Sequence, residues 1–287
     1  TLKTRNTTGW NGSIVASAYR VVQDQQRTAN NPEPLAASGG TGVGVRRDGT
    51  GFNTFELQGA YTPVAGDWTG GGHSLTVGLH SNDYTLEQRT DNLPDWRGTN
   101  GVETQFVGGK TKLMALYVQD AWRVAQGWTA TFGLRWESWA ALDGKQVFTP
   151  APPAPALYAE RKVVATSPKF SLAWDPVADL TLRLSAGEGT RFPTVAELFQ
   201  GTRSGNTLVL NDPNLKPEVS QALELFAERR FEAAVLRTSV FQDDVRDTIW
   251  SQTNTAVFPN VTNTQNVGRV RTRGIEFAGQ VDALGLP

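Results

Sequence analysis

The chain has 287 residues, of which 39% are hydrophobic and 19% are charged, and its formal net charge at neutral pH is −1. This length suits one large domain or two of ordinary size, and the balanced charge argues against nucleic acid as a partner. Cysteine is absent, which excludes disulfides and thiolate metal sites. No apolar run approaches the length of about 18 residues that a transmembrane helix needs, so a helical membrane protein is excluded as well.

The main pattern along the chain is the alternation of apolar and polar residues with a period of two, which is typical of β-strands. From Trp128 to Trp136, apolar residues occupy every second position, with Thr, Gly or Arg between them. Tilted membrane-spanning strands need about 9–11 residues, longer than the average soluble strand. In chain order, the pattern predicts about eleven strands, near residues 2–8, 13–23, 53–63, 73–88, 111–124, 128–142, 163–176, 179–190, 217–229, 233–250 and 267–281.

The connections between these strands alternate in length. Short turns are predicted near residues 9–12, 64–72, 125–127, 177–178 and 230–232, and long loops near 24–52, 89–110, 143–162, 191–216 and 251–266. Loops beyond about 12–15 residues are uncommon in compact soluble domains. In an up-and-down sheet all the long loops lie at one end. The sequence therefore predicts an all-β fold, an antiparallel transmembrane β-barrel with short periplasmic turns and long extracellular loops.

The positions of the tryptophans support this prediction independently. Trp128 and Trp136 lie on one face of one predicted strand, roughly 20 Å apart along the membrane normal at ordinary strand rise and tilt. The apolar band of an outer-membrane barrel is about 25 Å tall, and indole rings favour its edges. The alternative is a soluble sandwich with these rings in its core. We predict that six tryptophans form a membrane-interface girdle: Trp10, Trp68, Trp122, Trp128, Trp136 and Trp174.

Several longer motifs follow one another in the second half of the chain. They are residues 116–120 (Leu-Tyr-Val-Gln-Asp), 132–136 (Phe-Gly-Leu-Arg-Trp), 167–174, 190–199 (Thr-Arg-Phe-Pro-Thr-Val-Ala-Glu-Leu-Phe), 211–218 (Asn-Asp-Pro-Asn-Leu-Lys-Pro-Glu) and 273–277 (Arg-Gly-Ile-Glu-Phe). In order and spacing, these motifs resemble the TonB-dependent outer-membrane receptors of Gram-negative bacteria. Residues 1–110 fit this resemblance by alternation and loop pattern alone.

The resemblance implies that residues 1–287 are part of a twenty-two-stranded barrel domain, about half of its strands. It also implies an N-terminal plug domain and a segment that contacts the TonB–ExbB–ExbD complex, together with further C-terminal strands, none of which is in this sequence. Because the chain starts at Thr1 without a methionine or a signal peptide, we expect it to be a piece of a longer protein.

The function that the resemblance implies is active uptake of a scarce extracellular ligand across the outer membrane. A ferric siderophore is the expected cargo, with cobalamin, haem and oligosaccharides as alternatives, and outer-membrane lipid surrounds the barrel. The resemblance implies neither an enzyme nor a bound cofactor. Two rivals are a passive porin-like barrel, which an upstream plug would exclude, and a soluble glycan-binding β-protein, which would need no detergent for extraction.

Chemical motifs of other kinds are weak. His73 and His80 are seven residues apart on one predicted strand and so point to opposite faces, which disfavours a shared metal. The carboxylates at 224, 228, 243, 244 and 247 suit a polar barrel wall better than a glycosidase pair. The glycine-rich run at 39–44 lacks the Lys-Ser/Thr pair of a phosphate loop, and we interpret it as a flexible extracellular loop.

Ligand recognition is expected in the long loops and the upper lumen. Arginine offers a planar charged fork for carboxylate, catecholate or phosphate groups, and aromatic rings offer flat apolar surface and cation–π contacts. The candidate ligand-binding residues are Arg89, Trp96, Arg97, Tyr158, Arg161, Arg191, Phe192 and Arg203.

Overall fold

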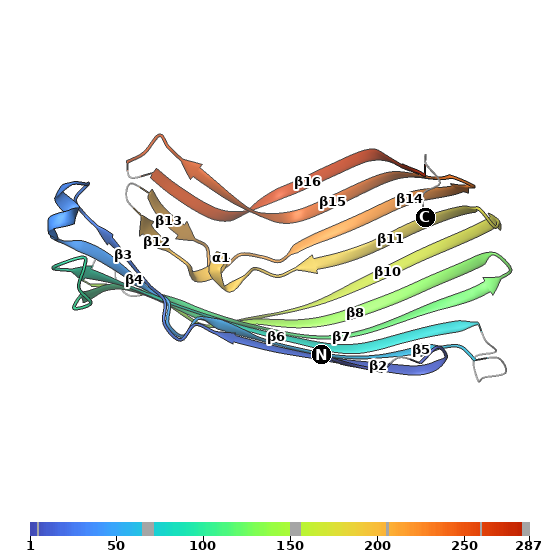
Figure 1. Cartoon of the computed structure of the whole chain (residues 1–287), viewed down its shortest axis with the longest axis horizontal. Helices are drawn as coiled ribbons and strands as arrows, with labels where there is room; N and C mark the ends of the chain where they lie inside the picture. The colour runs from blue at the N-terminus through green and yellow to red at the C-terminus, as the bar shows by residue number, and fades with distance from the viewer. Residues whose placement is uncertain (5, 65–71, 150–155, 205–206, 259, 283–287) are drawn as a thin grey trace.

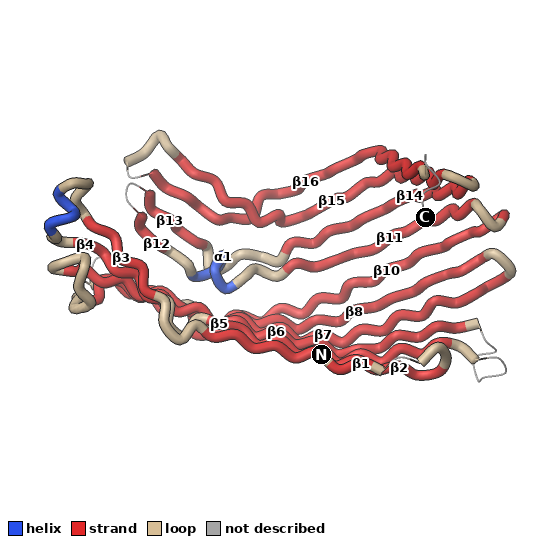
Figure 2. The backbone as a smooth tube through the Cα atoms, viewed as in Figure 1, coloured by secondary structure: helices blue, strands red, loops and turns tan. Residues whose placement is uncertain are grey.

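A computed structural model of the chain describes residues 1–282 except 5, 65–71, 150–155, 205–206 and 259. In it, long strands run side by side in chain order to form one open sheet (Figure 1). Helix contributes little, as the tube drawing shows (Figure 2). No helix in this part of the chain is long and apolar enough to cross a membrane.

Ten long strands form the body of the sheet. They are β2 (Gly9–Arg20), β5 (Gly51–Thr62), β6 (His73–Leu93), β7 (Val102–Ala125), β8 (Trp128–Phe148), β10 (Arg161–Val177), β11 (Leu180–Arg191), β14 (Glu218–Phe231), β15 (Ala234–Asn254) and β16 (Asn260–Val281). Each pairs with its neighbour in antiparallel fashion. This agrees with the predicted all-β antiparallel architecture of a partial barrel.

Shorter elements gather at one end of the long strands, on the left in Figure 1. They are β3 (Gln25–Ala29), the 3₁₀ helix η1 (Leu35–Ser38), β4 (Gly42–Arg46), β9 (Ala156–Leu157), the helix α1 (Val195–Phe199), β12 (Thr202–Ser204) and β13 (Thr207–Asn211). The two-residue strand β1 (Leu2–Lys3) pairs with β2. The opposite end carries short turns such as the one between β7 and β8, so long and short connections lie at opposite ends, as predicted.

The first predicted strand and turn were wrong. The strand at residues 2–8 is reduced to β1, and the turn predicted at 9–12 lies inside β2. The chain reverses before Gly9, whose φ of +77° suits glycine. The side chain of Asn11 accepts the backbone N–H of Asn6 across this turn, at 2.6 Å.

The long loops were predicted too long. The strands continue beyond the part of the sheet whose outward side chains are apolar, called the apolar zone below. The connection predicted at 89–110 shrinks to 94–101, and the one predicted at 251–266 shrinks to 255–259. The segment 24–52 contains the β3–β4 hairpin, in which Gly42–Arg46 pairs with both β3 and β6. The glycine-rich run, interpreted from the sequence as a loop, is therefore strand from Gly42 onward. Backbone pairing maintains these extensions where side chains no longer alternate.

The sheet has two chemically different faces. The face that α1 covers, which carries Trp139 and Ala141, is called the inner face here, and the opposite face is the outer face. Directly paired residues point to the same face, so the register assigns each position. Polar residues such as Arg135 and Glu137 alternate with apolar residues and lie on the inner face.

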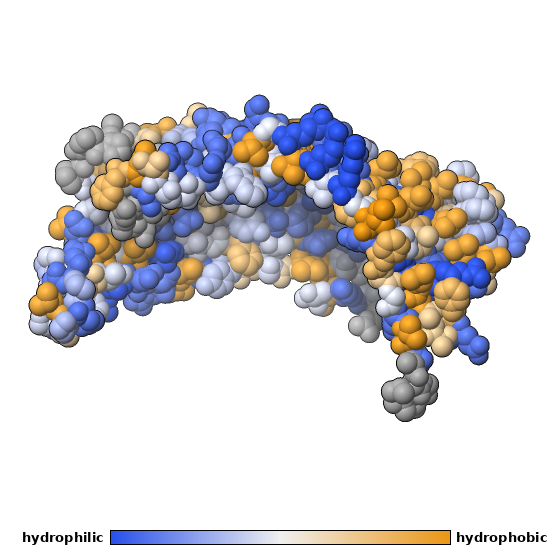
Figure 3. All heavy atoms as spheres, turned by 90° about the horizontal axis from the view of Figure 1, so that it is seen from above, coloured by the Kyte–Doolittle hydropathy of each residue, from blue (hydrophilic) through white to orange (hydrophobic). Residues whose placement is uncertain are grey.

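The outer face exposes large apolar side chains on neighbouring strands. Leu116 is 47% exposed, Phe132 51% and Leu225 56%. Apolar residues gather toward the end with the short turns (Figure 3). A continuous exposed apolar surface is unusual for a soluble protein and is characteristic of the lipid-facing side of a transmembrane barrel.

Tryptophan side chains pair on the outer face near the short turns. The rings of Trp128 and Trp174 stack with centroids 5.2 Å apart, and Trp10 packs on Tyr61 at 5.3 Å. Trp122 stacks on His73 at 5.4 Å. Trp136 lies farther along β8 and is 38% exposed. Trp68 is outside the described residues. Contact of these rings with the membrane interface stays a prediction.

Asp120 lies on the outer face, where a carboxylate needs a partner. Its Oδ2 atom is 2.7 Å from Nδ1 of His73, and this pair sits close to the short turns. A hydrogen-bonded partner lowers the free-energy cost of a polar group at the edge of an apolar zone. Asp120 therefore agrees with a lipid-facing outer surface.

Candidate functional site

The segment between β11 and β14 folds over the inner face. Its helix α1 lies against β6, β7 and β8. The helix begins with a capping box, in which the hydroxyl of Thr194 accepts the N–H of Glu197 and the Glu197 carboxylate accepts the N–H of Thr194. Because this arrangement satisfies two free backbone donors, the segment, called the inner loop below (residues 192–217), carries its own local order.

Phe199 fixes the inner loop to the wall of the sheet. Gly109 and Gly144 border its ring, because a Cβ atom added at either glycine would lie 2.3 or 2.4 Å from a ring carbon. Tyr158 stacks on the same ring, with centroids 5.8 Å apart, and its hydroxyl donates to Gln146 at 3.0 Å. Burial raises the pKa of Tyr158. The two glycines thus form a slot that only an unsubstituted backbone can provide.

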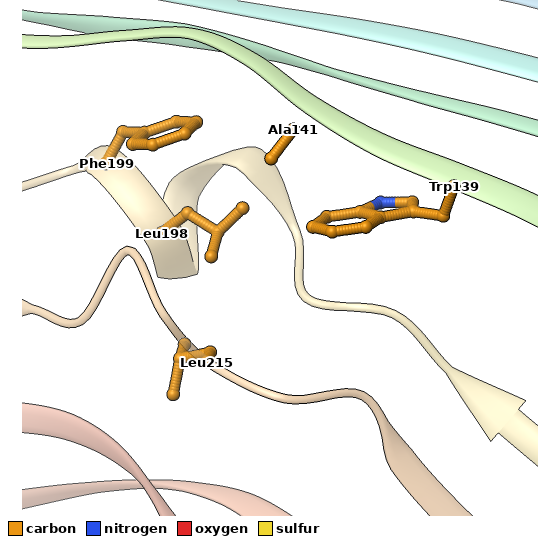
Figure 4. Close-up of a cluster of buried hydrophobic side chains, with 5 residues drawn as sticks. All are labelled: Trp139, Ala141, Leu198, Phe199 and Leu215. Atoms are coloured by element: carbon orange, nitrogen blue, oxygen red, sulfur yellow. The ribbon is translucent and has the colours of Figure 1, made fainter. Parts of the chain in front are cut away.

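A buried apolar cluster surrounds this slot (Figure 4). Leu198 is 1% exposed and Leu215 is fully buried, and both belong to one cluster with Trp139 and Ala141 of β8. The ring of Phe192 stacks on Trp139 with centroids 5.7 Å apart. Full burial of such side chains contributes about 1.5–3 kcal/mol each. The inner loop is therefore packed onto the wall as a small core.

Arg161 holds the returning part of the inner loop. Its guanidinium donates to the carbonyl oxygen of Leu215 at 3.0 Å and to that of Pro213. A planar guanidinium can reach two carbonyls at once. Arg161, at the start of β10, therefore fixes the segment that leads into β14.

Arg191 closes the two ends of the inner loop. It pairs with Glu197 of α1 at 3.1 Å and with Glu218 at the start of β14. The other oxygen of Glu218 accepts the backbone N–H of Ile249. Four predicted ligand-binding residues, Tyr158, Arg161, Arg191 and Phe192, thus meet around one structure, where they anchor the inner loop.

Trp96 and Arg97 lie elsewhere, in the connection between β6 and β7. The indole Nε1 of Trp96 donates to the carbonyl of Ala36 at 2.9 Å, which joins this connection to the β3–β4 hairpin. Arg97 pairs with Asp95 at 2.8 Å, and its guanidinium holds the pKa of Asp95 at about 2, below the ordinary 3.8. Trp96 therefore joins two segments at the loop end of the sheet, whereas the Arg97–Asp95 pair lies within the β6–β7 connection.

Arg89 and Arg203 complete the predicted set. Arg89 lies over the ring of Phe106, 4.9 Å from its centroid, and pairs with Glu103 at 3.1 Å. Since its neighbour Gln88 is buried at 3% exposure and successive residues alternate faces, Arg89 belongs to the outer face. Arg203 is in β12, and its side chain is outside the described part.

Three aromatic residues on the inner face were not among the predicted ligand-binding residues. Tyr19 and Tyr84 are 59% and 41% exposed, and Phe52 lies between them with centroids 5.9 Å from each. The register continues this row through Thr111 to Ala141, beneath α1. These residues share a face with polar positions, and this breach of the alternation is the sequence signal that could have found them.

The inner face is polar between the inner loop and the short turns. The Tyr117 hydroxyl donates to Glu56 at 3.1 Å and accepts from Gln58 at 3.3 Å. Arg135 pairs with Glu137 at 2.7 Å, and Glu137 is only 5% exposed. Such satisfied polar groups are characteristic of the interior of a large barrel.

The other chemical candidates are also wall residues. His80 pairs in register with the buried inner residue Ala115, whereas His73 pairs with Trp122 on the outer face, as the spacing predicts. Among the described residues, no three His, Asp or Glu side chains gather as a metal site would require. The carboxylate of Glu228 is taken up by Arg237 and Arg230, both at 2.6 Å.

A comparison with family models gives a match over residues 1–286 to the β-barrel of TonB-dependent receptor-like proteins. The chain belongs to this family. Comparison with curated protein sequences gives no match.

Solved receptors share the fold of this partial TonB-dependent receptor barrel. The ferric yersiniabactin uptake receptor FyuA from Yersinia pestis is 13% identical, with a TM-score of 0.63 over 99% of this chain and 39% of the receptor. The copper transporter OprC is 16% identical, with a TM-score of 0.67 over 96% and 42%. The ferric citrate transporter FecA is 12% identical, with a TM-score of 0.63 over 98% and 38%. The chain thus spans less than half the length of these structures.

Family membership assigns the two faces. TonB-dependent receptor barrels are outer-membrane proteins, so the outer face is the lipid-facing one and the inner face lines the lumen. The family and these structural neighbours are receptors and transporters, not enzymes.

Proposed function

We propose that the protein containing this chain imports a scarce ligand across the outer membrane of a Gram-negative bacterium with energy supplied through TonB, ExbB and ExbD. The observation that carries this proposal is the inner loop, packed into the lumen beside an exposed aromatic row. A water-filled lumen favours polar side chains, so the exposed aromatic row is not expected in a wall that lines only an open aqueous channel.

The aromatic row is the proposed ligand platform. Tyr19, Phe52 and Tyr84 expose flat apolar surface with two hydroxyl groups at the loop end of the lumen. Aromatic rings contribute large contact area, and a buried tyrosine hydroxyl still seeks a polar partner. A conjugated chelate with polar edges matches this surface.

A ferric siderophore is the proposed cargo. Similar structures include receptors described as binding ferric yersiniabactin and ferripyoverdine. Another neighbour was solved with a hemophore and haem, so haem is the main alternative.

Ligand contact by the residues predicted from the sequence also stays a proposal, but these residues already contact other parts of the chain. Seven of the eight have described contacts, and each of the seven is held by other residues of the chain, as Trp96 is by Ala36. Ligand contact by Tyr158, Arg161, Arg191 or Phe192 would therefore require rearrangement of the inner loop. The exposed aromatic row needs no such rearrangement.

The test uses the full-length receptor in a strain that lacks its own copy. Uptake of radioiron is measured with a panel of ferric siderophores and with haem, with and without a protonophore. We expect one ferric siderophore to be taken up by wild type, and a Tyr19→Ala/Tyr84→Ala variant to bind it at least about tenfold more weakly, since two aromatic contacts are lost. Ser185→Ala, an inner-wall change away from the row, serves as the matched control.

Each result separates the alternatives. Uptake that persists with the protonophore would indicate a passive porin-like barrel. Uptake of haem alone would keep the import mechanism and replace the cargo. Unchanged affinity in the aromatic variant would remove the row from the binding site.

A further inference from the structure

The outer face of β15 and β16 carries a group of basic side chains that ligand import does not explain. Register pairs Gln242 with Arg273, Asp244 with Arg271 and Arg246 with Arg269. These positions alternate in step with Val240 and Ile275, which are 48% and 62% exposed on the outer apolar surface. The four arginines, called the arginine cluster below, therefore point outward: Arg246, Arg269, Arg271 and Arg273.

The arginine cluster lies directly beyond the apolar zone. Arg273 is eight residues from Val281, which pairs with Ala234 at the short-turn end. At a rise of about 3.4 Å per residue and a tilt of about 40°, that separation is roughly 20 Å along the membrane normal, near the height of the apolar band. Figure 3 shows a strongly hydrophilic patch beside the apolar region that lies toward the short-turn end.

Asp244 organises part of this cluster. Its side chain is 7% exposed and accepts from both Arg269 and Arg271, which are themselves 55% and 41% exposed. Arg273 donates to Gln242 at 2.7 Å. One carboxylate thus fixes two guanidinium groups while their remaining N–H groups face outward, and the five charged groups together carry a net charge of +3.

Neighbouring strands differ at the corresponding outward positions. On β11 and β14 they hold Glu188 and Gln221, hydrogen-bonded to each other at 2.7 Å. The arginines therefore form a cluster on β15 and β16, whereas the outward lysines Lys112 and Lys162 lie on the separate strands β7 and β10. The cluster stands at a level where a barrel meets lipid headgroups. Guanidinium forks match phosphate oxygens in pairs, and such charge-assisted bonds are stronger than neutral ones.

We propose that the arginine cluster is a lipid-binding site that holds phosphate groups of an anionic lipid in the outer leaflet of the outer membrane. The inference rests on the outer-membrane orientation in the proposed function but is independent of the cargo. Acyl chains of the same lipid would cover the apolar surface around Leu225, Val240 and Ile275, so that one molecule satisfies both neighbouring surfaces.

The experiment titrates full-length receptor in neutral detergent with diphosphoryl lipid A or with monophosphoryl lipid A, and bound lipid is counted by native mass spectrometry. The main variant is Arg246→Gln/Arg273→Gln, because it leaves both partners of Asp244 in place. We expect tighter binding of the diphosphoryl lipid and a loss of roughly tenfold or more in the variant, as expected for hydrogen bonds to charged groups. Lys162→Gln, an exposed outward change on β10, should bind like wild type.

Several results would overturn the proposal. They are equal binding of the two lipids, unchanged binding in the double variant, and release of the lipid by excess inorganic phosphate, which would indicate a site for free phosphate. Heat-modified gel mobility checks folding, and Arg273→Gln alone replaces the double variant if that variant fails to fold. Lipid binding with no ligand uptake would sink the proposed function but not this site, and the reverse result would do the opposite.

Discussion

Glycine at two strand positions decides where the inner loop docks. Glycine inside a strand normally costs stability, because it has no side chain to pack and more backbone entropy to lose. At Gly109 and Gly144 this cost is offset by the ring of Phe199, which occupies the space that two Cβ atoms would fill. Phe199 is 55 or more positions from these glycines in the sequence, and its fit against the inner wall depends on the absence of a single Cβ atom at each of them.

Gly109→Ala is predicted to displace Phe199 from its slot. The added methyl would overlap a ring carbon at 2.3 Å, and overpacking of this kind costs about 1–3 kcal/mol. Hydrogen exchange of the inner loop would rise accordingly. The matched control is Gly189→Ala, where a Cβ meets nothing within 4 Å, and equal exchange in the two variants would contradict the slot.

Phe199→Ala tests the same contact from the other side. Removal of a buried phenyl ring costs about 3–5 kcal/mol, so we expect the inner loop to lose its protection against proteolysis while the sheet stays folded. Phe258, 86% exposed, provides the control Phe258→Ala, which should stay within about 0.5 kcal/mol of wild type. A protected loop in Phe199→Ala would show that the ion pairs alone hold it.

At the scale of elements, the segments at the loop end of the sheet are ordered by contacts between loops as much as by strands. The parallel pairing of β13 with β16 carries the inner loop across the tops of β14 and β15. Arg161 and Arg191 fix its ends, and Trp96 ties the β6–β7 connection to the β3–β4 hairpin. Each of these elements is stabilised by contacts with a neighbour that is distant in sequence.

Arg161→Ala is predicted to free the segment that leads into β14. Two carbonyl acceptors, at Pro213 and Leu215, would lose a charged donor, at a cost of about 1.5–3 kcal/mol. Arg161→Lys should recover only part of this, because an ammonium group lacks the planar fork. Amide exchange at residues 211–217 gives the measurement, and full recovery by lysine would refute the role of the fork.

Acid is predicted to loosen the β6–β7 connection only at low pH. Because Arg97 lowers the pKa of Asp95 to about 2, the ion pair contributes above the ordinary value of 3.8 and is lost as the pH falls through the folded value. Amide exchange at residues 94–101, corrected for the intrinsic pH dependence, should stay constant down to about pH 4 and then increase. Asp95→Asn should remove that transition, and its persistence would assign it to another group.

At the scale of the whole molecule, the two faces of one sheet face different environments, lipid on the outer face and the lumen on the inner face. The outer face exposes apolar side chains such as Leu184 at 41%, whereas its neighbour Ser185 pairs with Glu224 on the inner face. Since faces alternate at every residue, neighbouring positions on β11 belong to lipid and to the lumen.

Leu184→Arg and Ser185→Arg are a matched pair that tests this assignment. In lipid vesicles, the first is predicted to lower the unfolding free energy of the full-length receptor by about 2–4 kcal/mol, because a charge would enter the apolar band. The second should change it by about 0.5 kcal/mol or less, because the lumen is polar. Equal costs would reject the assignment of faces.

The sequence by itself determined the strands, their faces and the ends at which short and long connections lie, because alternation and turn residues act over neighbouring positions. It also indicated the family through ordered motifs such as residues 190–199 and 273–277. Ten of the predicted strands have long counterparts in the structure, and the errors fell at residues 2–12 and beyond the apolar zone, where alternation fades.

Only the tertiary structure decided what the loop residues do. Arg161 and Phe192 look alike in sequence whether they bind ligand or anchor a loop, and the choice depends on partners such as Leu215 and Trp139 that are brought close by folding. The arginine cluster shows the same limit, since its residues lie on two strands and become one surface only through the register of β15 with β16. Pairing across strands, a long-range property, creates sites that no local pattern records.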